Sequence, residues 1–258
     1  MLLIITSCIK VNNKIPFLTV KNENDRLNQY IETLVWAFTN TPFDKIIYCD
    51  NSGISLDELK NKLSITQKLS KQTGKRFELL GFQGNLKQVY LKGKGYGEGE
   101  IIDYVYKNSQ LLKSETVYYK ITGRLTINNI LTLIKNKQTE NIFLFRANAK
   151  YVDTRFYCLK ISDYKKYFRN VYKLTNDSNG YYLEHVYYDT LNNNKISYRR
   201  FLAEIEFRGI SGSTGEIYNT LNTTHWLKSF IFSSPLYTTY IGRLLTNIIV
   251  TIFKKQKF

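Results

Sequence analysis

The chain has few of the residues that bind metals or cross-link small domains. It contains 3 cysteines, 2 histidines and 3 prolines in 258 residues. Cys8, Cys49 and Cys158 lie far apart and form no C-x-x-C pair, which excludes a zinc knuckle and disfavours a disulfide framework. The histidines form no H-E-x-x-H motif, so a histidine-based metal centre is not expected. This cysteine usage is typical of a reducing compartment, and we predict a cytoplasmic protein.

Common nucleotide-binding and hydrolase motifs are absent as well. The segment KGKGYGEGE at 92–100 is rich in glycine, but its spacing matches neither G-x-G-x-x-G nor G-x-x-x-x-G-K-[ST]. The sequence also has no G-x-S-x-G elbow to present a nucleophilic serine. No proline-rich or glycine-rich linker divides the chain, and we predict a single domain over 1–235 followed by a helix over 236–258.

Acidic residues are scarce relative to basic ones. The 37 Lys and Arg residues outnumber the 21 Asp and Glu residues, which gives a formal charge of +16. This excess favours an anionic partner such as a nucleic acid, a phosphorylated substrate or an acidic membrane surface. The 21 Tyr and 15 Phe residues recur mainly inside strand-like and amphipathic segments, which indicates core packing. No nucleic-acid-binding module is recognisable, so a nucleic acid is not the expected partner.

Predicted strands and helices alternate through the first half of the chain. Hydrophobic spacing predicts, in order, a strand over 2–9, a helix over 25–38, a strand over 45–49, a helix after Ser55, short strands over 77–82 and 89–91, a helix over 101–112, a strand entering YYKITGRL at 118–125, and a helix over 127–134. Glu58 follows Ser55 at the spacing of a capping box. This alternation predicts an α/β fold with a mostly parallel central sheet flanked by helices, whose ligands bind beyond the carboxyl ends of the strands.

The second half of the sequence is less regular. We expect strands over 141–146 and 156–161, a helix capped by Ser162 and a helix over 181–191. The terminal segment carries an apolar helical stripe followed by three lysines: Ile241, Leu244, Leu245, Ile248, Ile249, Ile252, Lys254, Lys255 and Lys257. Polar residues interrupt it too often for a bilayer span. Such a helix either docks on its own domain or lies on an anionic membrane, the inner face of the cytoplasmic membrane in this case.

Two segments are candidates for chemistry. The glycine-rich segment reads as a flexible loop that carries Lys92 and Lys94 into a helix N-terminus, where backbone N–H groups favour phosphate; a plain surface loop is the alternative. Glu184 and His185 lie side by side among aromatics in YYLEHVYYDTL. Burial among aromatic rings raises the pKa of a carboxyl group and suits it to proton abstraction, whereas an exposed helix face is the alternative.

The layout and the phrases KGKGYGEGEIIDY, YYKITGRL and YYLEHVYY resemble bacterial glycosyltransferases of the GT-A fold that build lipopolysaccharide and capsule. In that family a strand end usually carries an Asp-x-Asp pair that holds a divalent metal. This chain has Lys120-Ile-Thr-Gly-Arg124 at the matching place. Arginine and lysine can also stabilise the charge on a leaving phosphate, so the resemblance implies a metal-independent enzyme without a cofactor.

The resemblance also implies roles for particular residues. The nucleotide-sugar site would comprise Thr6, Ser7 and Asp50 at the nucleoside, Lys92, Lys94 and Gly95 on the phosphate side, and Lys120 and Arg124 at the leaving group. Glu184 would be the catalytic base, with His185 in reserve, and transfer would invert the anomeric centre. The donor would be UDP-linked or CMP-linked, and the acceptor a glycan or a lipid-linked glycan.

Two other classes of function are compatible with the sequence. A basic nucleic-acid-binding module would show oligonucleotide affinity that falls steeply with salt. A non-catalytic scaffold at a membrane surface would keep its cellular function after Glu184→Ala.

Overall fold

The computed structural model describes residues 1–11, 19–135, 139–146, 150–201, 203–210, 215 and 217–218. The helix expected over 236–258 lies outside the described residues. So does the predicted end of the domain at 235. Among the described helices, none has the length and apolar character needed to cross a membrane.

Strands and helices alternate in the first half of the molecule, as predicted. The elements are β1 (Leu2–Ser7), α1 (Glu23–Thr39), β2 (Lys45–Asp50), α2 (Leu56–Lys62), α3 (Ile65–Thr73), β3 (Arg76–Gly81), α4 (Leu86–Lys92), α5 (Lys94–Asn108), the turn η1 (Leu112–Ser114) and β4 (Val117–Thr122). Ser55 caps α2 as expected, because its hydroxyl accepts a hydrogen bond from the Glu58 backbone N–H at 3.2 Å.

The second half adds shorter elements. They are β5 (Leu125–Ile127), α6 (Ile130–Leu133), β6 (Ile142–Arg146), β7 (Tyr151–Lys160), α7 (Ile161–Asp163), the π-turn η3 (Tyr164–Phe168), the turns η4 (Val171–Leu174) and η5 (Asp177–Asn179), α8 (Leu183–Asn193), β8 (Arg199–Arg200), β9 (Phe207–Ile210) and β10 (Ile217–Tyr218). The helix expected over 127–134 is thus only one turn long. The helix expected after Ser162 is replaced by α7 and η3, without a side-chain cap.

Within the described part of the chain, seven strands form the central sheet in the order β3-β2-β1-β4-β7-β6-β8, and β5, β9 and β10 form a small second sheet. Neighbouring strands in the central sheet are parallel except where β7 pairs with β4 and with β6. The predicted α/β fold with a mostly parallel central sheet flanked by helices is therefore confirmed. Because β7 runs against the others, its first residues lie at the edge where β1, β2 and β4 end.

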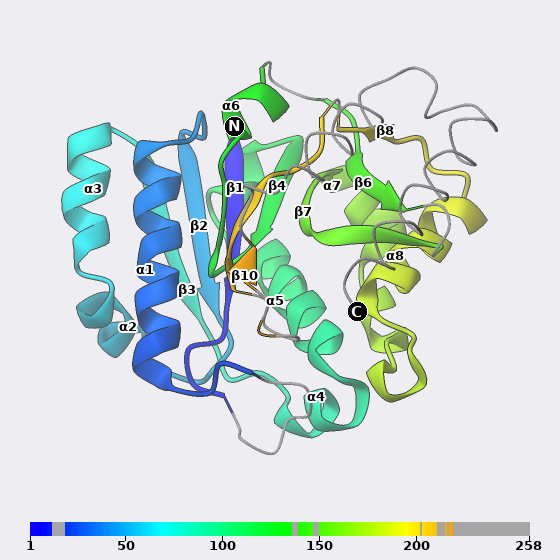
Figure 1. Cartoon of the computed structure of the whole chain (residues 1–258), viewed down its shortest axis with the longest axis horizontal. Helices are drawn as coiled ribbons and strands as arrows, with labels where there is room; N and C mark the ends of the chain where they lie inside the picture. The colour runs from blue at the N-terminus through cyan, green and yellow to red at the C-terminus, as the bar shows by residue number, and fades with distance from the viewer. Residues whose placement is uncertain are drawn as a thin grey trace, which may run out of the picture.

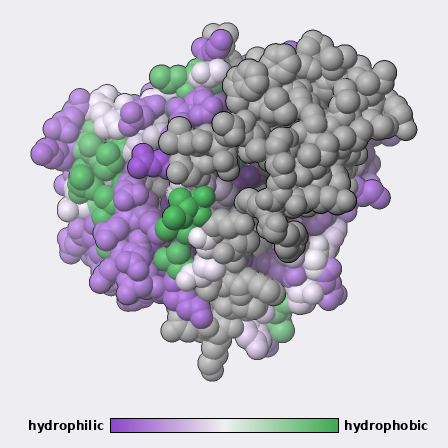
Figure 2. Space-filling model, in the orientation of Figure 1, coloured by the Kyte–Doolittle hydropathy of each residue, from purple (hydrophilic) through white to green (hydrophobic). Residues whose placement is uncertain are grey.

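Helices cover both faces of this sheet, and each face has its own core. In Figure 1, α1 and α3 lie on one side of β1 to β4, and α5 and α8 lie on the other. Alternate residues of the strands point to opposite faces, so Leu3 and Ile5 pack with α1 whereas Leu2 and Ile4 pack with α5. The outer surface of α1, α2 and α3 is largely hydrophilic, with small apolar patches (Figure 2).

The glycine-rich segment is helical, so the prediction of a flexible loop was wrong. Residues 94–100 form the first two turns of α5, and 89–91, expected as a strand, lie in α4. The glycines allow close packing: a Cβ on Gly99 would lie 2.1 Å from the Tyr172 Cβ, and one on Gly95 would lie 3.0 Å from the Leu183 Cβ. Helix propensity alone disfavours glycine here, but tertiary packing requires it.

Candidate functional site

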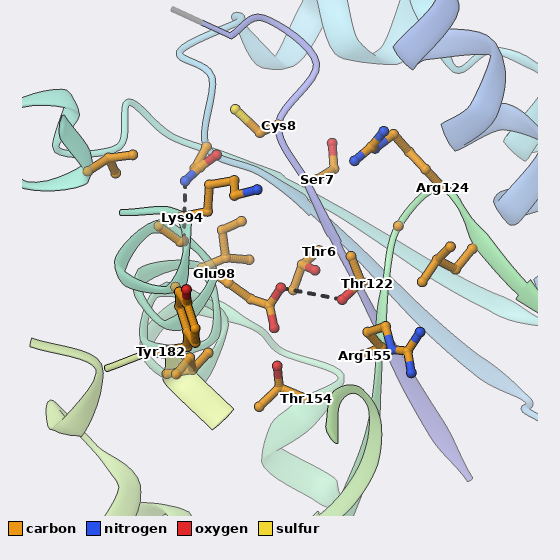
Figure 3. A pocket seen from close by; sticks show the side chains of 18 of the residues that line it. Thr6, Ser7, Cys8, Lys94, Glu98, Thr122, Arg124, Thr154, Arg155 and Tyr182 are labelled. Atoms are coloured by element: carbon orange, nitrogen blue, oxygen red, sulfur yellow. Dashed lines mark hydrogen bonds between the residues drawn. The ribbon is translucent and has the colours of Figure 1, made fainter. Parts of the chain in front are cut away.

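A cavity of about 820 Å³ lies at the carboxyl edge of the central sheet. The ends of β1, β2 and β4, the start of β7 and the first turns of α5 and α8 surround it (Figure 3). Among the residues predicted for the site, Thr6, Ser7, Lys94, Gly95, Arg124, Glu184 and His185 line this cavity. Asp50, Lys92 and Lys120 do not line it.

Thr6 and Ser7 bring hydroxyl groups to the cavity from the end of β1. Both are buried, with 5% and 2% of their surface exposed. The Thr6 hydroxyl donates to the Ile121 carbonyl at 3.5 Å, and the Ser7 hydroxyl lies 2.5 Å from the Tyr48 hydroxyl. The strand end is therefore fixed in place, and it presents a small polar floor to a ligand.

Asp50 has a structural role at the end of β2. Its carboxylate accepts the Ser7 hydroxyl and the backbone N–H groups of Ile9 and Ser52, both at 2.9 Å. These bonds hold the turn after β2, as turn chemistry would predict. The neighbouring Asn51 lines the cavity instead. Its Nδ2 donates to the Gly97 carbonyl at 3.3 Å, while its buried Oδ1 has no partner within the described part of the chain.

Two cations reach the same space from opposite walls. Figure 3 shows Lys94 extending from α5 and Arg124 from the turn after β4, on either side of Ser7. Arg124 occupies the left-handed region with φ 78°, which an arginine rarely adopts, and its backbone N–H donates to the Thr33 hydroxyl at 3.0 Å. Strained backbone of this kind is commonest where a side chain has to be aimed at a ligand.

Three basic side chains, Arg124, Lys94 and Arg26, lie around this corner of the cavity. Burial lowers the pKa of Arg124, and the neighbouring charge of Arg26 adds to this effect. Burial also lowers the pKa of Lys94; the carboxylates of Asp177 and Glu184 oppose this effect, whereas the charges of Arg124 and Arg26 add to it. The guanidinium of Arg26 is held in place by the Cys8 carbonyl, which accepts hydrogen bonds from its Nε at 2.8 Å and its Nη2 at 2.7 Å. Arg124 donates from Nη1 to Gln29, but its buried Nε has no partner among the described residues. An anion placed here would relieve the repulsion between the three cations and satisfy that donor.

The N-terminus of α5 is occupied by a carboxylate, which corrects the expectation that it would be open to phosphate. Asp177 accepts the backbone N–H of Lys94 at 2.8 Å, with a further contribution from that of Gly95. Burial raises the pKa of Asp177, and these backbone hydrogen bonds oppose the rise. The helix start is thus already neutralised by the chain itself.

Lys120 and Lys92 are corrections to the expected phosphate clamp. Lys120 lies inside β4, is fully buried, and forms an ion pair with Glu98. Its Nζ also donates to the Thr122 hydroxyl and the Thr154 carbonyl, each at 2.8 Å, so all its donors are used. Lys92 ends α4 and donates to the Lys173 carbonyl. Strand periodicity could have shown that Lys120 precedes the strand end, because the turn of Gly123 and Arg124 comes later.

Glu184 is the carboxyl group on the far wall of the cavity. It lies in the first turn of α8, and its Oε1 accepts a hydrogen bond from the Thr154 hydroxyl at 2.9 Å. Burial raises the pKa of Glu184 to about 7, and the nearby negative charge of Glu98 adds to the effect. A carboxyl group with this pKa takes and releases a proton near neutral pH.

His185 faces an aromatic group beside Glu184. Its ring centroid lies 5.7 Å from that of Tyr182, 5.9 Å from that of Tyr151 and 6.1 Å from that of Tyr181. The Nδ1 atom accepts the Tyr182 backbone N–H at 3.3 Å and so takes part in capping α8. One ring nitrogen of His185 therefore already has a structural role, whereas the Glu184 carboxyl group lines the cavity beside Thr154.

Sequence reasoning missed Glu98, Asn51, Thr154 and Arg26. Glu98 could have been suspected, because it is an acidic residue between glycines in YGEGE, and Gly99 allows close packing against Tyr172. Asn51 directly follows β2, so its place at a strand end was a signal, whereas Thr154 and Arg26 carried none. Among the described residues, no group of three or more His, Cys, Asp or Glu side chains is arranged to hold a metal ion.

Comparisons with known proteins do not assign the chain to a family. No family model matches it, and no curated protein matches it. Among solved structures, it is similar to a CMP:2-keto-3-deoxy-manno-octonic acid synthetase complexed with CTP. The match has 10% identity and a TM-score of 0.37, and it covers 81% of this chain and 92% of that chain. At this score the likeness carries no argument about function.

Proposed function

We propose that this protein is a glycosyltransferase that moves a sugar from a nucleotide-activated donor to a hydroxyl group of a glycan or a lipid-linked glycan. One observation carries the proposal. The cavity at the carboxyl edge of the sheet combines two cations, Arg124 and Lys94, with the carboxyl group of Glu184, whose pKa is raised to about 7. Transfer from a phosphate leaving group to a hydroxyl requires both charge stabilisation and a base.

The phosphate groups of the donor would lie between Arg124 and Lys94. In this geometry the unpartnered Nε of Arg124 donates to a phosphate oxygen, and Lys94 acts as a point charge from the facing wall. Arg26 contributes charge from a fixed position, because its guanidinium donates to the Cys8 and Val20 carbonyls and to the Tyr30 hydroxyl. Of the basic residues predicted from the sequence, Arg124 and Lys94 keep a role at the phosphate groups, whereas Lys120 and Lys92 do not.

The nucleoside would lie over the ends of β1 and β2. Thr6, Ser7 and Asn51 line that part of the cavity, and the buried Oδ1 of Asn51 can accept a hydrogen bond from a base or ribose. A buried acceptor without a partner costs free energy, which a bound nucleoside would recover. We propose either a UDP-linked or a CMP-linked donor.

Glu184 would act as the base. It removes the proton from the acceptor hydroxyl while that oxygen forms a bond to the anomeric carbon. The bond from the anomeric carbon to the donor phosphate oxygen breaks, and its electron pair leaves with the phosphate beside Arg124. A single displacement of this kind inverts the anomeric centre. His185 is the alternative base. Comparing the transfer rates of Glu184→Gln and His185→Gln shows which of the two side chains is the base, because its variant loses more activity.

Nucleotide binding is the most direct test of this proposal. We expect UDP or CMP to raise the melting temperature of the full chain with and without EDTA, because a ligand that binds only the folded state stabilises it. Lys94→Ala should remove this shift and Lys92→Ala should retain it. The two lysines lie two positions apart, and only Lys94 lines the cavity. If no nucleotide raised the melting temperature, the proposed donor site would be wrong. If the rise required Mn²⁺, the proposed metal independence would be wrong.

Transfer itself needs a separate measurement. Wild-type protein should release nucleotide from a suitable nucleotide sugar in the presence of an acceptor glycan, and Glu184→Gln should reduce that rate by about 100-fold or more. Affinity for an oligonucleotide that falls steeply with salt, without nucleotide-sugar turnover, would instead support a nucleic-acid-binding function.

A further inference from the structure

A chain of polar contacts connects the buried ion pair of Lys120 and Glu98 to Glu184. Glu98 projects from α5 into the cavity, with 21% of its side chain exposed, whereas Lys120 on β4 is fully buried. The Glu98 carboxylate bonds to the Lys120 ammonium and accepts the Thr122 hydroxyl at 3.3 Å. Figure 3 shows the bond from Thr122 to Glu98. Two fixed donors thus hold Glu98 in one orientation.

Thr154 is the link from this pair to the next carboxyl group. Its backbone carbonyl accepts Lys120 at 2.8 Å, and its hydroxyl donates to Glu184 Oε1 at 2.9 Å. One residue at the start of β7 therefore contacts both the buried ammonium and Glu184. The contacts span α5, β4, β7 and α8, four of the elements that surround the cavity.

Stability alone gives a poor account of the pair. Removing a lysine and a carboxylate from water is costly, and hydrophobic residues of similar volume often stabilise the folded state equally well or better. Here Lys120 lies beside the ring of Tyr157, in a core built largely from aromatic and aliphatic side chains. The pair keeps a negative charge at the cavity wall that an apolar substitute would not supply.

We propose that Glu98, held by Lys120, is a positioning residue that sets the proton affinity of Glu184, and that Thr154 opposes it by donating a hydrogen bond to Glu184. The role of Glu184 as the base rests on the proposed function, but its proton affinity does not. Glu98 repels the ionised form of Glu184, and the Thr154 hydroxyl stabilises that form. The balance between them lets Glu184 take up and release a proton near neutral pH.

Other charged groups also act on Glu184. Lys94 on α5 and Lys120 on β4 favour its ionised form, and Asp153 on β7 opposes it. His185 is its neighbour on α8. On the turns packed against α8, Lys166 and Lys173 lie against the rings of Tyr167 and Tyr172 instead. After burial, the charge of Glu98 has the largest effect in raising the pKa of Glu184, so Glu98 is the group to change.

The test is a direct titration of Glu184 in the full chain, without donor or acceptor. Glutamate labelled with ¹³C at the side-chain carboxyl group gives one NMR signal per residue, and Glu184→Gln identifies the signal of Glu184. We expect Glu98→Gln to lower the titration midpoint of Glu184 by about one pH unit, which is a tenfold change in proton affinity. Thr154→Val should raise the midpoint, because it removes a donor to the ionised form and nearly preserves the shape.

Glu100→Gln is the matched control. It removes the same charge from the same helix, but Glu100 faces away and accepts the Asn85 backbone N–H at 3.0 Å. Its variant should leave the midpoint unchanged. Opposite shifts in Glu98→Gln and Thr154→Val would support the proposal, since local unfolding would move both towards the ordinary value of glutamate.

An unchanged midpoint in Glu98→Gln, or shifts of the same sign in both variants, would overturn the proposal. If Glu98→Gln does not fold, Thr154→Val alone decides, and a midpoint at or below that of the wild type contradicts the role of Thr154. Because no substrate is used, these results are independent of nucleotide-sugar turnover. If turnover is also found, its acidic limb should move with the midpoint in each variant.

Discussion

Asp177 caps the helix that carries Lys94: its carboxylate accepts the Lys94 backbone N–H at 2.8 Å. The turn η5 thereby holds the start of α5 against the cavity. The side chain of Lys94 leaves from the same residue and extends towards Arg124 (Figure 3). One contact between segments 83 positions apart thus supplies both a helix cap and the placement of a cation.

The first prediction concerns this cap. We expect Asp177→Ala to lower the free energy of unfolding by about 1 kcal/mol, the usual cost of losing a side-chain cap. Asp57→Ala is the control, because Asp57 lies near a helix N-terminus, in the first turn of α2, but is 90% exposed. This substitution should change the free energy of unfolding by less than about 0.5 kcal/mol. Urea unfolding measures both. Equal losses in the free energy of unfolding would show that the contact of Asp177 with α5 stabilises the protein no more than an exposed aspartate does.

A second prediction concerns the close approach of α5 to η4. Alanine is the better helix former by about 1 kcal/mol, so propensity alone predicts that Gly99→Ala stabilises the protein. The added Cβ would lie 2.1 Å from the Tyr172 Cβ, and we expect destabilisation by about 1–3 kcal/mol instead. Gly97→Ala, whose nearest neighbour is the Val89 Cγ2 at 3.3 Å, should be clearly milder. Thermal unfolding followed by circular dichroism measures the order of the two variants.

These glycines show where sequence reasoning reached its limit. Local composition at 92–100 favours a loop, but the segment is helical, and the packing of Tyr172 and Leu183 against α5 explains why glycine is needed at positions 99 and 95. By contrast, the apolar runs of β1 and β2 and the periodicity of α1 are local signals. They predicted these elements to within about two residues. The parallel sheet then followed from the alternation of elements.

The site was predictable to a similar extent. Residues next to strand ends, such as Ser7 and Arg124, reach the cavity because the carboxyl ends of parallel strands share one edge. Lys120 was misassigned because its position within the strand depends on where the turn begins. Thr154 was missed because β7 is antiparallel, so its first residues reach this edge rather than its last.

A third prediction follows from the raised pKa of Glu184. The folded state binds this proton more tightly than the unfolded state, so the contribution of Glu184 to stability falls as pH rises from about 4.5 to about 7. Glu184→Gln removes the cost of ionisation and retains an acceptor for Thr154. We expect it to stabilise the protein by about 1–3 kcal/mol at pH 8 and to have little effect at pH 4. Urea unfolding at both pH values tests this, with the exposed Glu32→Gln as control.

The last prediction separates the geometry of Arg124 from its charge. Lysine at this position keeps a positive charge but lacks the planar fork and the Nε donor, which is buried without a partner among the described residues. We expect Arg124→Lys to weaken binding of a nucleoside diphosphate about tenfold and to leave binding of the corresponding nucleoside unchanged, because only the phosphate groups reach this corner. Calorimetry with the two ligands measures the difference.

Lys92→Ala should leave both affinities unchanged, since Lys92 bonds to the Lys173 carbonyl outside the cavity. Equal losses for nucleoside and diphosphate in Arg124→Lys would mean that the variant distorts the strand end rather than the phosphate site. That outcome is physically reasonable at a residue with φ 78°, because the same turn also carries the contact to Thr33. The nucleoside measurement is therefore what makes the tenfold loss specific to phosphate.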